Sequence, residues 1–228
     1  MFKYVAIICS LTIFMFSAPL WAAEALEGVY SEPYGIIKVV VKDDANYRVD
    51  ILEEGDEPVV VMAVGGKRWL ILGRSDAETP WKATDYDAML EYYRQTESAL
   101  PDLSAAAIIM ETGVQTLGKF EGTAFNVNHP TEEDLALVLS DDPDVVKISG
   151  RLLDLLQDNA SPADVLTAYV TKRLGREYET NFGLLRSNGP EQVQRYYELQ
   201  SLERRDFPAS YFALPENVKI MTIEEMFN

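Results

Sequence analysis

Four short segments rich in apolar residues follow one another between residues 36 and 72, and this run limits the possible folds more than any other feature. The segments cover residues 36–42, 47–52, 59–64 and 67–72. In the second segment apolar side chains alternate with Arg48 and Asp50, which indicates a strand with one buried and one solvated face. Gly65-Gly66 separates the last two segments and suits a two-residue hairpin turn, because glycine accepts positive φ. Links this short join antiparallel neighbours, so the run predicts an antiparallel meander of four strands that opens the mature chain.

Helices and further strands are expected in the rest of the chain. Helical spacing of apolar residues predicts helices over residues 85–98, 103–110, 145–157 and 161–174. Strand patterns cover residues 116–127, 135–140, 182–186 and 193–205, and an extended segment follows at 211–215. Asn188-Gly189 is the expected hairpin turn between the last two strands. No repeat or interdomain linker divides these segments, so we predict one α+β domain, residues 24–228, with a single antiparallel sheet and helices on one of its faces.

The first residues have the pattern of an export signal. Lys3 supplies a positive charge, residues 5–16 are almost purely apolar, and small residues then follow as far as Ala25. The apolar run is too short for a membrane-spanning helix, which needs about 20 residues. We therefore predict a signal peptide over residues 1–23, cleaved after Ala23 or Ala25, and a periplasmic protein. The alternative is an uncleaved N-terminal anchor.

Composition excludes several classes of protein. The 228 residues include 20 Lys+Arg and 37 Asp+Glu, which gives a formal net charge of −17. A chain this acidic without a basic cluster is unsuited to nucleic acid, whose phosphates need a Lys/Arg footprint. The only cysteine, Cys9, lies inside the predicted signal, so we expect no disulfide, thiol chemistry or cysteine-zinc site in the mature chain. We also expect no transmembrane segment there, whereas the oligomeric state stays open.

The sequence contains no recognisable catalytic motif. His129 is the only histidine, and the G-x-S-x-G pattern of a nucleophile elbow does not occur, so a Ser-His-Asp triad lacks its parts. Carboxylates are plentiful, but the sequence singles out no pair of the kind that hydrolyses glycosides. The acidic residues 141–144 lack the central glycine and distant glutamate of a calcium loop, and they are better read as a turn before a helix. We predict a non-enzymatic protein without catalytic residues, metal or cofactor.

Several short motifs, taken in order, resemble those of a known superfamily. They are Y-R-V-D at 47–50, G-G-K-R-W at 65–69, G-L-L-R at 183–186, Y-E-L-Q-S-L-E at 197–203 and S-Y-F-A-L-P at 210–215. Their order is similar to that in the LolA-like lipoprotein-carrier superfamily and in uncharacterised exported families grouped with it. The resemblance covers nearly the whole mature chain.

The resemblance implies a strongly curved antiparallel sheet, an unclosed barrel, with helices packed on its concave face. In the carriers that concave side holds acyl chains, so we expect a lipid or a lipidated protein as the partner. The candidate ligand-binding residues are Arg48, Trp69, Trp81, Met89, Tyr93, Phe125 and Phe212. Arg48 would anchor a headgroup or hold a helical lid. The alternatives are that Arg48 lies on a solvated strand face, that the other six residues are ordinary core, and that helices within 85–110 and 145–174 fill the cavity.

A second hypothesis needs no cavity. The acidic stretches at residues 53–57 and 132–134 would form an exposed surface for a basic partner, and the protein would then be a structural or interaction protein of the envelope. The more ordinary reading of such charge runs is solvated loops.

Overall fold

Strands dominate the structure, a computed structural model. It describes residues 22–32, 35–53, 55, 57–73, 80–96, 107–117, 119–128, 130, 135–158, 181–187 and 197–227. The described strands are β1 (Ala23–Glu32), β2 (Gly35–Asp43), β3 (Asn46–Glu53), β4 (Val59–Val64), β5 (Lys67–Leu72), β6 (Lys82–Asp85), β7 (Ile108–Leu117), β8 (Phe120–Asn128), β9 (Leu135–Ser140), β10 (Asn181–Ser187), β11 (Glu198–Phe207) and β12 (Lys219–Ile220). The described helices are α1 (Tyr86–Thr96), α2 (Pro143–Asp158), the 3₁₀ helix η1 (Ala209–Phe212) and α4 (Ile223–Phe227).

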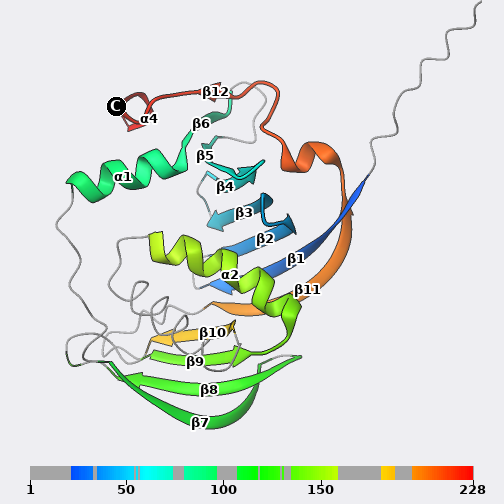
Figure 1. The fold of residues 1–228 in the computed structure, drawn as a ribbon, viewed down its shortest axis with the longest axis vertical. Helices are drawn as coiled ribbons and strands as arrows, with labels where there is room; N and C mark the ends of the chain where they lie inside the picture. Colours follow the sequence, from blue (N-terminus) through cyan, green and yellow to red (C-terminus); the bar gives the residue numbers. More distant parts are fainter. Residues whose placement is uncertain are drawn as a thin grey trace, which may run out of the picture.

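All twelve described strands belong to one sheet. Their order is β12-β6-β5-β4-β3-β2-β1-β11-β10-β9-β8-β7, and only the pairing of β12 with β6 is parallel. The sheet curves without closing on itself (Figure 1). The α+β class and the single, curved, antiparallel sheet predicted from the sequence are therefore confirmed.

The predicted meander is present as β2 to β5, joined by short turns. Alternation along each strand sends one set of side chains to the concave face and the other to the convex face. The row Tyr47, Ala63 and Arg68, in register across β3, β4 and β5, faces the concave side. The next row faces the convex side and contains Arg48 and Met62.

Helix α2 lies against β1, β2 and β10 on the concave side of the sheet (Figure 1). Its apolar stripe is buried in the main core cluster through Val145, Ile148, Leu152, Leu153 and Leu155. The spacing of these residues follows the helical period, which is why residues 145–157 were predictable as an amphipathic helix.

A glycine in β1 allows α2 to approach the sheet closely. A Cβ built on Gly28 would lie 2.5 Å from Cγ2 of Ile148, which is closer than real Cβ contacts. Any larger residue at position 28 would therefore have to displace the helix or the side chain of Ile148.

The chain after β11 covers part of the convex face. Pro208 ends β11, and η1 follows with Tyr211 N–H donating to the Pro208 carbonyl at 2.9 Å. Phe212 packs on the convex side of β1 and β2 against Ala25 and Val40. The chain then reaches the β6 edge, where β12 and α4 contact β6.

Four sequence predictions are wrong in part. The meander does not open the folded chain, because β1 precedes it and lies between β2 and β11. Residues 108–110 belong to β7 and not to a helix, since they pair with β8. Residues 116–127 are not one strand, because β7 ends at Leu117 and Lys119 lies in a turn before β8. The tail 211–215 begins in η1 and is not extended throughout.

Some predictions fall on residues outside the described ranges. These are the signal peptide as far as residue 21, residues 103–106, the whole helix 161–174, the turn Asn188-Gly189, His129 and the acidic stretch 132–134.

Candidate functional site

Three of the seven predicted ligand-binding residues lie on the concave side. Met89 and Tyr93 come from α1, and Phe125 comes from β8. Met89 and Phe125 are buried members of the main core cluster, and Tyr93 packs against that cluster. The structure therefore brings these three residues into the same apolar core as the buried stripe of α2.

Trp69, Trp81 and Phe212 lie on the convex side. Trp69 pairs with Met62 across β4 and β5, and both tryptophans pack against the small cluster that contains Met62 and Ile71. Phe212 belongs to a third cluster, next to β1 and β2. The predicted residues thus occupy opposite faces of the sheet and do not line one cavity.

Arg48, the seventh predicted residue, also lies on the convex side. Its Nε donates to Oδ1 of Asp50 at 2.7 Å, and its guanidinium lies 4.8 Å from the ring centroid of Tyr211. Lys38 approaches the same carboxylate, with its Nζ 3.6 Å from Oδ2 of Asp50. This network attaches the C-terminal segment to the meander.

Tyr211 completes the network from η1. Its hydroxyl donates to Oδ2 of Asp50 at 3.0 Å. Burial, together with the negative charge of Asp50, raises the pKa of Tyr211 above its ordinary value. The phenol therefore stays protonated and remains a donor to the buried carboxylate.

A polar cavity of about 400 Å³ lies at one end of the meander on the concave side. It is lined by Asp44, Tyr47, Ala63, Gly66, Arg68, Arg151 and Asp154. We call this set the mouth. Asp44 and Gly66 lie in the turns that follow β2 and β4, and the Gly66 N–H donates to the Ala45 carbonyl at 2.9 Å. The two turns, joined by this hydrogen bond, therefore form one side of the mouth, and Arg151 and Asp154 of α2 form the other side.

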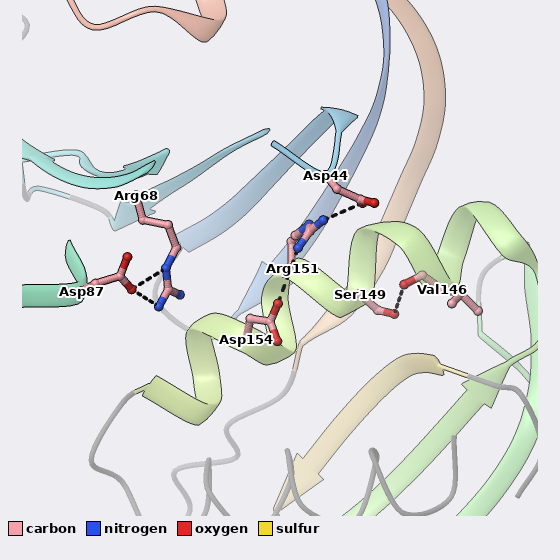
Figure 2. Close-up of polar contacts among 7 residues, drawn as sticks. All are labelled: Asp44, Arg68, Asp87, Val146, Ser149, Arg151 and Asp154. Atoms are coloured by element: carbon pink, nitrogen blue, oxygen red, sulfur yellow. Dashed lines mark hydrogen bonds and ion pairs between the residues drawn. The ribbon is translucent and has the colours of Figure 1, made fainter. Parts of the chain in front are cut away.

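Arg68 connects the mouth to α1. Its Nε donates to Oδ1 of Asp87 at 2.8 Å, and a terminal nitrogen contacts the same oxygen (Figure 2). Its guanidinium also lies 4.9 Å from the ring centroid of Tyr86, the first residue of α1. The contact fixes the start of α1 relative to β5.

Arg151 connects the mouth to α2. It donates to Oδ1 of Asp44 at 2.8 Å and lies 3.7 Å from Oδ2 of Asp154, one turn further along the helix (Figure 2). A second cavity of about 330 Å³ is also lined by Asp44, Arg151 and Asp154, together with Lys147 and other residues of α2. The ion pair between Arg151 and Asp44 therefore borders both cavities.

Tyr47 lies between the two arginines. The guanidinium of Arg151 is 4.7 Å from the centroid of its ring. Burial raises the pKa of Tyr47, although the charges of Arg68 and Arg151 act in the opposite direction. The phenol is therefore protonated at neutral pH.

The mouth can hold a polar group. Two guanidiniums and a phenol are hydrogen-bond donors suited to oxygen acceptors. In the buried part of α2 beside it, the hydroxyl of Ser149 donates to the Val146 carbonyl at 3.3 Å within the helix (Figure 2). Across the described ranges, no cluster of three or more His, Cys, Asp or Glu side chains is arranged to hold a metal ion.

The residues of the mouth were not predicted from the sequence as a site. Arg68 was visible only as part of the G-G-K-R-W motif, and Arg151 only as a polar position of an amphipathic helix. Alternation in β3 and β5 places Tyr47 and Arg68 on the apolar face of the meander, where an arginine is unusual, and that signal was available.

The sequence matches no family model and no curated protein. Its resemblance to the lipoprotein carriers therefore remains a prediction. Among the described residues, no helix combines the length and apolar character needed to cross a membrane.

Proposed function

We propose that this protein is a non-enzymatic, LolA-like binding protein of the periplasm. It holds an apolar ligand, or the acyl chain of a lipidated partner, between α2 and the concave face of the sheet. The mouth is the polar entrance, where Arg68 and Arg151 meet the ligand's headgroup.

The observation that carries this proposal is the way α2 is held. The helix packs on β1, β2 and β10, within a continuous apolar core that extends from β3 to β8, and the surface beneath it would receive an acyl chain if the helix moved. Burial of such a chain is favourable by roughly 25 cal/mol for each Å² removed from water.

The polar attachment of α2 at the mouth is weak. The side chain of Asp44, the partner of Arg151, is 95% exposed. Exposed ion pairs contribute about 0–1 kcal/mol, so water or a ligand headgroup can replace this contact at little cost. The helix is thus held mainly by its apolar stripe, for which an acyl chain can substitute.

The direct test is native mass spectrometry of protein purified without detergent, followed by titration of the delipidated protein with a fluorescent fatty acid. We expect a copurifying lipid, or saturable uptake of the probe. Arg151→Gln should alter uptake, whereas Lys67→Gln is a matched control. Lys67 also forms an ion pair with an aspartate, because its Nζ lies 3.1 Å from Oδ2 of Asp85. Its contacts are with Asp85 and Trp69, neither of which belongs to α2.

A disulfide lock tests whether α2 must move. The Cβ position built on Gly28 lies 3.4 Å from Cβ of Ile148, close to the lower end of the Cβ separation in natural disulfides, about 3.5 Å. The double variant Gly28→Cys, Ile148→Cys in a Cys9→Ser background should take up the probe when reduced and lose uptake when oxidised.

Uptake that is equal in the oxidised and reduced forms would contradict a binding site beneath α2. Failure of both the native and the delipidated wild-type protein to carry any lipid or probe would reject the proposal as a whole. The acidic interaction protein without a ligand cavity would then be the better description.

A further inference from the structure

Strand β7 forms one end of the sheet, and among the described residues only β8 pairs with it. At the opposite end the edge strand β12 has only two residues, and α4 also contacts its neighbour β6. An edge strand presents unpaired backbone N–H and C=O groups that can accept a further strand.

The side chains of β7 make this edge unusually apolar. Ile108, Met110 and Val114 are 62%, 47% and 73% exposed. The strand contains one charged residue, Glu111, and neither lysine nor proline, which are the residues that commonly protect edges. A bulge between Glu111 and Gly113 interrupts its register with β8, so a partner strand would pair on either side of this point.

Two simple partners for this edge are a second copy of the chain and a segment of another protein, and electrostatics favours the second. A second copy would bring together two chains that each carry a formal charge of −17. Exposed Glu111 and Glu121 on β7 and β8 outnumber exposed Lys119 in the turn between these strands, so the described charges beside the edge are net negative. A cationic partner is attracted by the same field that repels a second copy.

We propose that β7 binds an extended, cationic peptide segment of another protein as an additional strand. The segment would alternate apolar residues, which pack on Ile108 and Met110 on one face of β7, with lysine or arginine residues on the other face, where the bulge places Glu111 and Val114. This inference goes beyond ligand binding and does not depend on it, because β7 makes none of the contacts of the mouth.

The experiment uses the full chain and a short synthetic peptide that alternates lysine and valine. Hydrogen exchange is followed by mass spectrometry, and affinity by fluorescence anisotropy of the labelled peptide. We expect exchange to slow within residues 108–117. Val114→Lys, which places a charge on the edge, should weaken binding by about tenfold or more. Met110→Lys is a second variant with the same expectation.

Ile220→Lys is the matched control. Ile220 is 59% exposed, it lies in β12 at the opposite end of the sheet, and its substitution changes the net charge by the same amount. It should change affinity by less than about twofold.

Four results would overturn the proposal. Equal weakening by Val114→Lys and Ile220→Lys would show attraction by overall charge alone. Unchanged exchange within residues 108–117, or equal protection by a peptide that alternates glutamate and valine, would exclude the cationic segment. A peptide-free dimer that Val114→Lys dissociates would make a second copy the occupant.

Discussion

The two faces of the sheet are covered by different parts of the chain and held by different polar contacts. On the concave face, α2 and α1 come from the middle of the chain and bury an apolar core. On the convex face, η1 and the segment after it come from the C-terminal end and cover smaller apolar clusters.

The polar contacts differ in burial. The side chain of Asp50 on the convex face is 6% exposed. Its carboxylate forms ion pairs with Arg48 and Lys38 and accepts a hydrogen bond from Tyr211. The carboxylate of Asp87, which holds Arg68 on the concave side, is 55% exposed. Buried ion pairs lose several kcal/mol when one partner is removed, whereas exposed pairs lose little. The convex cover is therefore held by a buried polar contact in addition to its apolar clusters, whereas the polar contacts of the concave cover are exposed and its attachment depends on the apolar stripe of α2.

The largest effect is expected from the apolar stripe itself. Leu152 of α2 is fully buried in the concave core, so Leu152→Ala should lower the free energy of unfolding by about 2–5 kcal/mol. Urea denaturation followed by circular dichroism measures the change. A loss below about 1 kcal/mol would mean that α2 is not packed on the sheet in solution, and the claim that apolar burial holds the concave cover would then be wrong.

The middle-sized effect compares two carboxylates, one on each face. Asp50→Asn removes the buried charge that Arg48 and Tyr211 contact, and it should cost about 2–4 kcal/mol. Asp87→Asn removes the same charge from the exposed pair with Arg68 and should cost less than about 1 kcal/mol. Both are read from the same denaturation curves. Equal losses would show that burial does not separate the two faces.

Local patterns explain how much of this architecture could be predicted. Residues 36–72 carry alternation and tight turns, so β2 to β5 could be located from sequence. The central strand β1 could not, because Glu27 and Gly28 break its apolar pattern. Its place depends on pairing with β11, about 170 residues away in sequence.

The candidate site was less predictable for the same reason. Alternation shows which residues of one strand share a face, but not which face receives the helices. Trp69 and Phe125 were therefore grouped together although they lie on opposite faces. The meeting of Arg68, Arg151 and Asp44 at the mouth depends on the docking of α2, which no local pattern encodes.

The smallest effect concerns how α1 is attached to the sheet. Asp85 precedes α1, and its Oδ1 accepts a hydrogen bond from the Ala88 N–H at 3.1 Å. Burial tends to raise the pKa of Asp85, but hydrogen bonds from Ala88 and Lys67 outweigh it and hold the pKa below its ordinary value.

A carboxyl group whose pKa is lower in the folded state stabilises the protein above its unfolded-state pKa of about 3.9, and this stabilisation is lost as the pH falls through the folded-state value. Asp85→Asn keeps a good helix N-cap but removes the ionisable group. The variant should therefore lose less stability than the wild type when the pH is lowered from neutral to acid, with a difference that is small because the Asp85 side chain is 38% exposed. Denaturation midpoints measured across this pH range give the two slopes. Parallel slopes would show that the charge of Asp85 does not hold α1, and the ion pair between Arg68 and Asp87 would then be the better account of how α1 is attached to β5.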